Sequence, residues 1–162
     1  MTRSPALIIC LFVLLAVAAV SCGRDADEPV AGELRVVTTT YPLAFMTQRI
    51  GSDRVAVIQL VKPGVEAHDF EPAPSDVLSI STADVFIFNH PAFEEWALNT
   101  VTASRSGGNG SAIAVETIDG EADESSFDAH VWLNPLKAQL QAQRILAALI
   151  TADPDGSTEY EK

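Results

Sequence analysis

Cysteine is almost absent from this chain of 162 residues. Only Cys10 and Cys22 occur, and both lie within the first 22 positions. No disulfide can therefore form beyond Cys22, and the later residues offer no thiol nucleophile. About 140 residues follow, which is enough for one domain with a real hydrophobic core but short for two ordinary lobes.

Motifs that announce catalysis are missing as well. The sequence has no serine in a nucleophile elbow and no glycine-rich loop of the kind that holds phosphate. Basic residues are also scarce. The chain has 10 lysines and arginines and 22 aspartates and glutamates, which gives a formal net charge of -12. An acidic surface repels nucleic acid and attracts cations. We therefore expect no nucleic-acid partner.

One long apolar run is present, at residues 6–20, and Arg3 precedes it. The run is short for a membrane-spanning helix and fits the apolar region of a secretion signal. It ends in the sequence Ala-Val-Ser-Cys at 19–22, which resembles a bacterial lipoprotein signal in which Cys22 becomes the lipidated first residue. We expect residues 1–22 to be this signal. The alternative is an ordinary signal peptide that is cleaved near Ser21.

The rest of the chain alternates between strand-like and helix-like patterns. Residues 23–33 are polar and predict a flexible tether, residues 34–156 predict one α/β lobe, and residues 157–162 begin a further helix. Such alternation predicts a parallel sheet with helices on both faces. We expect strands at 34–39, 55–61, 85–88 and 112–115, and helices at 41–50, 77–81, 93–102 and 135–152.

His68 lies in the most informative segment, residues 64–76. The segment follows a predicted strand and ends in Pro-Ser-Asp, which can begin a helix. In α/β proteins ligand-binding groups lie on such loops at the ends of strands. Glu66, Asp69 and Glu71 are close enough along the chain to orient the imidazole. The alternative is a solvated surface histidine.

His130 lies just before another helix start, in the sequence Asp-Ala-His-Val-Trp-Leu-Asn-Pro at 128–135. Asn134 predicts a helix cap, and residues 131–133 look buried. With His68 it could form half of a tetrahedral metal site, although a histidine bonded to a backbone carbonyl is the alternative. His90 also follows a strand and could line the same crevice or serve as a turn residue. The acidic residues 119–128 predict a solvated loop or a weak cation attractor.

These motifs resemble the substrate-binding lipoproteins of bacterial zinc and manganese ABC importers. Residues 64–76 follow the pattern Gly-x-x-x-His-x-(Phe/Tyr)-Glu-Pro-x-Pro-Ser-Asp, and residues 128–135 are similar to Asp-Pro-His-x-Trp-Leu-Asp-Pro. Residues 36–42 resemble the family's first strand and turn. The resemblance implies that His68 and His130 are ligands of a transported zinc or manganese ion. It also implies a monomer without enzymatic activity, anchored outside the cytoplasm by lipid on Cys22, which delivers its metal to a membrane permease.

The chain departs from the family pattern at several positions. Ala129 replaces proline, Asn134 replaces aspartate, His90 and Pro91 stand where glycine is usual, and a histidine-rich loop is missing. The resemblance implies two lobes with the metal between them, and this sequence ends about where the connecting helix would begin. We therefore expect an amino-terminal lobe without the second lobe's ligands, a histidine or glutamate and an aspartate. Zinc is favoured over manganese because nitrogen ligands suit it better.

Two other hypotheses stay open at this point. A small exported zinc hydrolase could use the same histidines with Glu66 as the general base, but such a centre needs a third protein ligand. A non-functional remnant would expose the apolar surface around Phe70 and Trp132 and would aggregate.

Overall fold

A four-stranded parallel sheet forms the centre of the protein. The computed structural model describes residues 32–108, 112–118 and 130–162. The strands are β1 (Leu34–Thr38), β2 (Val55–Gln59), β3 (Val85–Phe88) and β4 (Ile113–Glu116), in the order β2-β1-β3-β4. In register, Val36 of β1 pairs with Val57 on one side and Val85 on the other. The two central strands are thus β1 and β3.

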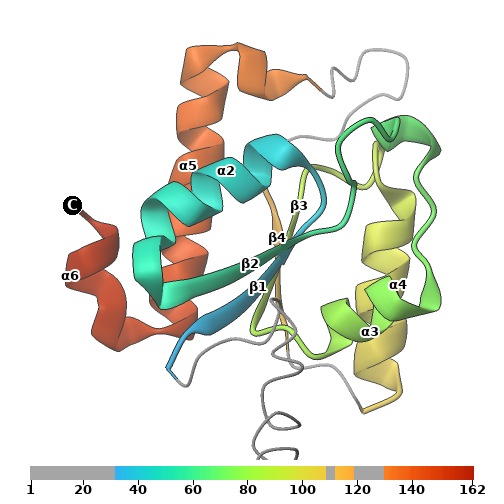
Figure 1. Cartoon of the computed structure of the whole chain (residues 1–162), viewed down its shortest axis with the longest axis horizontal. Helices are drawn as coiled ribbons and strands as arrows, with labels where there is room; N and C mark the ends of the chain where they lie inside the picture. The colour runs from blue at the N-terminus through green and yellow to red at the C-terminus, as the bar shows by residue number, and fades with distance from the viewer. Residues whose placement is uncertain (1–31, 109–111, 119–129) are drawn as a thin grey trace, which may run out of the picture.

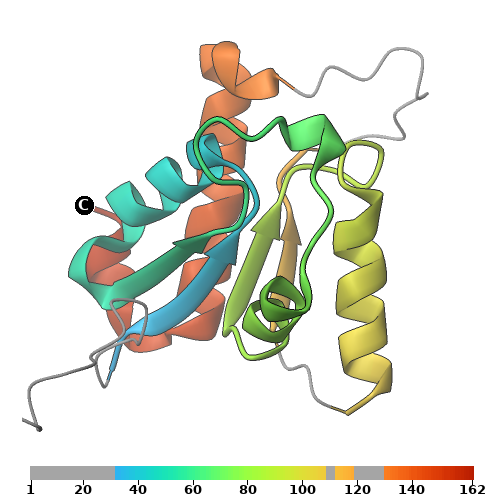
Figure 2. The ribbon, with the colours of Figure 1, turned by 45° about the vertical axis from the view of Figure 1, so that its right-hand side comes forward.

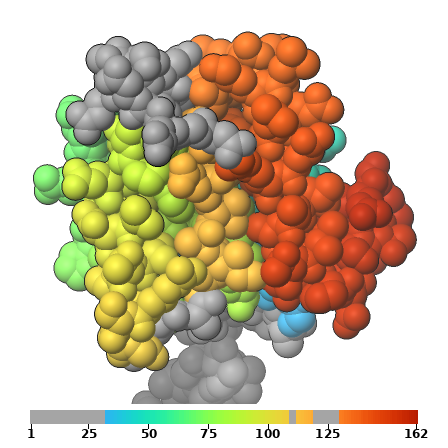
Figure 3. All heavy atoms as spheres, turned by 180° about the vertical axis from the view of Figure 1, so that it is seen from behind, coloured from blue at the N-terminus to red at the C-terminus, as the bar shows by residue number. Residues whose placement is uncertain are grey.

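Helices cover both faces of this sheet, as the sequence predicts (Figures 1 and 2). One face carries α2 (Tyr41–Gly51), α5 (Pro135–Ala152) and the short α6 (Ser157–Tyr160), and the other carries α3 (Pro74–Ser81) and α4 (Glu95–Ser106). Seen from behind, β4 lies at the surface between α4 and α5 (Figure 3). Within the described ranges no helix is long and apolar enough to cross a bilayer.

The core has two layers because neighbouring residues of a strand point to opposite faces. Val36 packs under α2 and α5, whereas Val37 packs under α3 and α4. β3 is buried along its whole length, as expected for a central strand of a parallel sheet. Trp96 contacts the ring of Phe86 in the second layer.

Several predicted boundaries differ from the structure, among them the start of α3 at Pro74 rather than at 77 and that of α4 at Glu95 rather than at 93, and two of the differences have identifiable reasons. The predicted loop at 104–111 begins too early, because α4 continues to Ser106. There the Ser106 hydroxyl donates to the Thr102 carbonyl, so these polar residues remain inside the helix. β2 ends at Gln59 rather than at Val61. The loop that carries His68 therefore starts two residues earlier than expected.

Helix α5 begins where the sequence predicts, and its apolar residues are divided between the core and the surface. Asn134 Oδ1 accepts hydrogen bonds from the backbone N–H groups of the first turn, at 3.0 and 3.4 Å. Leu136 and Leu140 are nevertheless 73% and 57% exposed, and Leu133, which we expected to be buried, is 75% exposed. The buried face consists instead of Gln141, Ile145, Ala148 and Leu149.

An ion-paired cluster closes the far end of α5. Asp153 Oδ2 accepts hydrogen bonds from Arg54 Nε (2.9 Å) and from the Tyr160 hydroxyl (2.7 Å). These two donors hold the pKa of Asp153 below its usual range, with Tyr160 contributing most. A side chain at Gly156 would collide with both Asp153 and Arg54, so only glycine fits there. The cluster ties the last described segment to the start of β2.

The predicted signal at 1–22, all but the last two residues of the predicted tether, and the whole acidic stretch 119–128 lie outside the described residues.

Candidate metal centre

All three histidines lie on loops at the carboxyl edge of the sheet. His68 belongs to the single turn η3 (Ala67–Asp69), which follows β2. His90 comes directly after β3, and His130 precedes the turn η4 (Val131–Leu133) ahead of α5. In Figure 1 these segments gather at one end of the molecule. This edge is where open α/β sheets bind their ligands.

The structure brings His68 and His130 together, with ring centroids 6.1 Å apart and ring planes inclined by 54°. The loops that carry them follow β2 and β4, the two outer strands of the sheet. Three strand spacings of about 4.8 Å separate those strands by roughly 14 Å, so the closeness of the two rings does not follow from neighbouring strands. Zinc–nitrogen bonds of about 2.0–2.1 Å would place two imidazole centroids roughly 5 Å apart around one tetrahedral ion.

Each imidazole is packed against an aromatic ring. The His68 ring meets Phe93 edge-on at a centroid distance of 4.6 Å and an angle of 84°. The His130 ring lies 5.4 Å from that of Trp132. Glu66, expected to orient the His68 imidazole, instead accepts the backbone N–H of His68 at 3.4 Å and caps the turn η3. Aromatic packing therefore orients the imidazole where we expected a carboxylate.

His90 does not join this pair, because the structure engages both of its ring nitrogens. Nδ1 accepts a hydrogen bond from the Ala92 backbone N–H at 3.0 Å, and Nε2 lies 3.3 Å from Glu116 Oε1. Only 8% of His90 is exposed. Of the two hypotheses for this residue, the turn residue is the one that fits.

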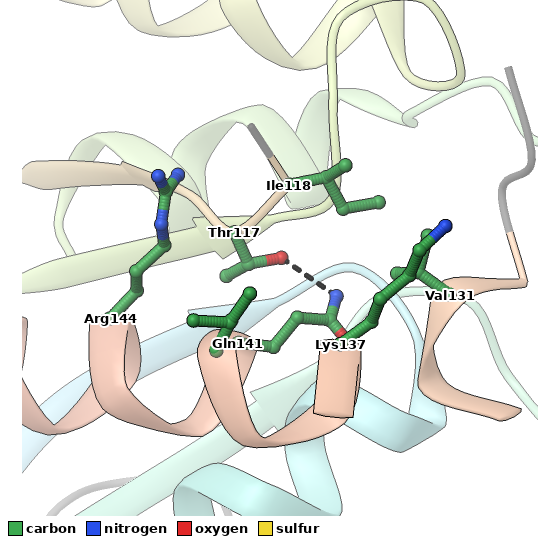
Figure 4. Close-up of a pocket in the computed structure, with 7 residues that line it drawn as sticks. Thr117, Ile118, Val131, Lys137, Gln141 and Arg144 are labelled. Atoms are coloured by element: carbon green, nitrogen blue, oxygen red, sulfur yellow. Dashed lines mark hydrogen bonds between the residues drawn. The ribbon is translucent and has the colours of Figure 1, made fainter. Parts of the chain in front are cut away.

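A buried polar network, which no local pattern in the sequence predicts, connects the turn after β3 to Thr117 and α5. Glu94 is 2% exposed, and its carboxylate accepts the backbone N–H of Asn89 (2.6 Å) and the Asn89 side-chain amide (3.0 Å). Gln141 Nε2 donates to Asn89 Oδ1 (3.2 Å) and to Thr117 Oγ1 (3.0 Å; Figure 4). Burial raises the pKa of Glu94, and the hydrogen bonds from Asn89 act against this rise. The network joins α5 to the loops after β3 and β4.

A pocket of about 160 Å³ adjoins this network on the α5 side (Figure 4). It lies between the end of β4 and α5 rather than between the two histidines. Within the described residues no group of three or more histidine, cysteine or acidic side chains is arranged to hold a metal. This part of the chain therefore offers a pair of imidazoles. The pocket is lined by Thr117, Ile118, Val131, Lys137, Leu140, Gln141 and Arg144.

The family model of the periplasmic zinc-uptake complex component A, ZnuA, matches residues 36–162. The chain belongs to the ZnuA family. It is 32% identical over 169 residues to the high-affinity zinc uptake system protein ZnuA of Bacillus subtilis, which covers 93% of this chain and 52% of the relative. It is 29% identical over 166 residues to the manganese ABC transporter substrate-binding lipoprotein ScaA of Streptococcus gordonii, covering 96% and 54%.

Solved structures agree with this assignment. The metal-dependent lipoprotein YcdH from Bacillus subtilis matches with a TM-score of 0.71 and 37% identity, over 80% of this chain and 48% of that one. The zinc-bound ZnuA-like domain of AdcA from Streptococcus pneumoniae matches with a TM-score of 0.72 and 29% identity, over 80% and 48%. The predicted fold class is therefore confirmed, and the structure corresponds to one lobe of the ZnuA-family fold.

The chain spans about half the length of the curated relatives it matches. The resemblance found in the motifs at 64–76 and 128–135 is confirmed at the level of the family. The assignment of His68 and His130 as ligands, and of Cys22 as the lipid attachment site, remains a prediction for this ZnuA-family chain.

Proposed function

We propose that this chain is a metal-binding component of an ABC importer, which captures zinc, or manganese, outside the cytoplasm and delivers it to a membrane permease. His68 and His130 are the ligands that this lobe contributes. The observation that carries the proposal is the 6.1 Å separation between the ring centroids of two imidazoles that follow the two outer strands, β2 and β4. Family membership supports the same function.

The donor set favours zinc over manganese. Imidazole nitrogen suits zinc, whereas manganese is better served by carboxylate, carbonyl and water oxygen. Two imidazoles leave half of a tetrahedral shell to other groups, so the affinity of this chain alone should fall well short of the roughly 10–16 kcal/mol of structural zinc sites. The related protein ScaA is named for manganese rather than for zinc. The choice of metal thus depends on the ligands that complete the shell.

The proposal includes the route of the protein and its mode of action. Residues 1–22 direct export, Cys22 carries the lipid, residues 23–33 form the tether, and residues 34–156 form the metal-binding lobe, from which residues 157–162 lead toward a second lobe. The relatives named as lipoproteins support such an anchor. The protein works as a monomer and binds its cargo without chemical change, which its similarity to substrate-binding lipoproteins supports.

Zinc titration of the purified chain by calorimetry tests the assignment. We expect one zinc ion per chain, and we expect His68→Ala and His130→Ala each to weaken binding by more than the roughly 10–100-fold that loss of an outer-shell partner costs. Asp155→Asn is the matched control, because this exposed carboxylate lies beyond the far end of α5, about 27 Å of helix away. It should bind zinc as the parent does.

Equal zinc affinity in the parent, His68→Ala and His130→Ala would remove the two histidines from the site. Binding that falls as much in Asp155→Asn would mean that zinc is attracted by the acidic surface in general.

A further inference from the structure

The turn formed by residues 89–94 lies between the two outer loops that carry the histidines. It follows the central strand β3, whereas His68 and His130 are reached from the outer strands β2 and β4. The His90 carbonyl accepts the backbone N–H groups of Phe93 and Glu94, both at 2.9 Å, so the turn is closed on itself. Phe93 projects from this turn and meets the His68 ring edge-on at 4.6 Å.

His90 fixes the turn from inside. Its Nδ1 accepts the Ala92 N–H at 3.0 Å, so the ring proton is assigned to Nε2. Nε2 lies 3.3 Å from the carboxylate of Glu116, the last residue of β4. The Glu116 carbonyl in turn accepts a hydrogen bond from Arg144 Nη1 of α5 at 2.9 Å. A continuous series of contacts therefore runs from α5 through Glu116 and His90 to the turn.

The rest of the turn is held by the buried network. Glu94 accepts two hydrogen bonds from Asn89, and Gln141 of α5 donates to Asn89 from the other side. Asn89 is fully buried and Glu94 nearly so. The turn is consequently a rigid support, whereas the loop that carries His68 exposes most of its residues between 62 and 69.

We propose that Phe93 is a positioning residue for His68, and that the contact between His90 and Glu116 clamps the 89–94 turn so that Phe93 keeps the imidazole in its metal-binding orientation. An edge-on aromatic contact restricts rotation of the imidazole before any ion arrives, so less ordering remains for the binding step. The metal part of this inference rests on the proposed function above, whereas the contact itself is a property of the metal-free chain.

The clamp is tested first without metal, by the nuclear Overhauser effect between ring protons of Phe93 and His68. We expect the effect in the parent and in Glu116→Gln, whose amide oxygen still faces His90 Nε2. We expect its loss in Glu116→Ala. Glu95→Ala is the matched control, because Glu95 is exposed and belongs to the first turn of α4, one residue after the turn under test. It should retain the effect.

Zinc titration of the same proteins tests the consequence. We expect Phe93→Leu and Glu116→Ala to weaken zinc binding roughly two- to tenfold with unchanged stoichiometry, which is the range of a lost aromatic contact. Glu116→Gln should restore the parent's affinity, and Glu95→Ala should leave it unchanged.

The results separate this inference from the proposed function. If Glu116→Ala keeps the ring contact, or if Phe93→Leu binds zinc as the parent does, the positioning role is wrong. If the parent binds no zinc, the proposed function fails, while loss of the ring contact in Glu116→Ala and its return in Glu116→Gln would still establish the clamp. Should Glu116→Ala fail to fold, Phe93→Leu decides the matter, because leucine keeps the apolar volume without the ring.

Discussion

Replacement of the buried Glu94 by glutamine should make the protein progressively more stable than the parent as the pH rises. Glu94 is 2% exposed, and burial raises its pKa above the usual value for glutamate of about 4.3. A raised folded-state pKa means that the protonated carboxyl is favoured in the folded protein. The associated stability is fully present below about pH 4.3 and is lost as the pH rises through the folded-state pKa.

The slope of this effect follows from proton linkage. Between the unfolded and folded pKa values, the free energy of unfolding of the parent should fall relative to Glu94→Gln by up to about 1.4 kcal/mol per pH unit, and the difference should become constant above the folded pKa. At the acidic end the two proteins should have nearly equal stability. The two donors of Asn89 meet different oxygens of Glu94. In a protonated carboxyl and in an amide alike, one of these two acceptor positions bears hydrogen, so both lose one acceptor.

Urea denaturation at several pH values between 4 and 8, followed by circular dichroism, measures this difference. Other carboxylates titrate in the same range, but they titrate in both proteins and cancel in the comparison. Glu95→Gln, at the adjacent exposed glutamate, is the matched control for the loss of one carboxylate at this place in the chain. A flat difference for Glu94→Gln, or a variant that becomes less stable than the parent as the pH rises, would refute the argument that burial dominates at this carboxyl.

Three further changes test the core, a helix cap and the cluster at the end of α5. Leu149→Ala removes a fully buried side chain and should lower the free energy of unfolding, measured by urea denaturation, by about 2–5 kcal/mol. Leu140→Ala, on the exposed face of the same helix, should change that free energy by no more than about 0.5 kcal/mol. Asn134→Ala removes the α5 cap and should cost about 0.5–2 kcal/mol, while Asn99→Ala inside α4 should not destabilise the protein; equal losses would mean that the cap is unimportant. Asp153→Asn should destabilise the protein near neutral pH, and the loss should disappear as the pH falls through the lowered folded-state pKa, below about 3.9; a loss that persists in acid would contradict the ion pairing with Arg54.

The sequence predicts the elements of this fold because their local signals agree with their tertiary surroundings. β3 consists only of large apolar residues and is buried along its length. Asn134 and Pro135 together specify the start of α5, and the structure places it there. Such positions need no knowledge of distant residues, which is why pattern analysis succeeds at them.

The sequence could not predict that Gln141 lies on the buried face of α5. Leu136 and Leu140 continue an apolar helical pattern, yet they are exposed, and the core-facing position between them and Ile145 is taken by Gln141. That glutamine is buried because Asn89 and Thr117 meet its amide. These partners come from two other segments of the chain, so no local pattern indicates the polar network. A polar residue on an otherwise apolar helix face is the one signal that could have drawn attention to it.

The candidate site shows the same division between local and non-local information. The motifs place His68 and His90 after strands and His130 before a helix, and the fold brings all three to one edge of the sheet. The distances between the three rings depend on the path that each loop takes, and the sequence motifs do not encode that path. His90 follows a strand as His68 does, but its short turn directs both ring nitrogens to protein partners.

The sheet order explains why the candidate site needs support from its centre. β2 and β4 are outer strands, about 14 Å apart, and the two imidazoles that follow them in the chain come within 6.1 Å of each other. The loop that carries His68 exposes most of its residues between 62 and 69, so it has few buried contacts with which to hold the ring to the fraction of an ångström that coordination requires. The turn after β3 has the opposite character, since it is short, central and bonded through Asn89, His90 and Glu94 to β4 and α5. Precision at the histidines should therefore come from the rigid turn between them, which makes Phe93, rather than any carboxylate near His68, the residue on which the geometry of the first ligand depends.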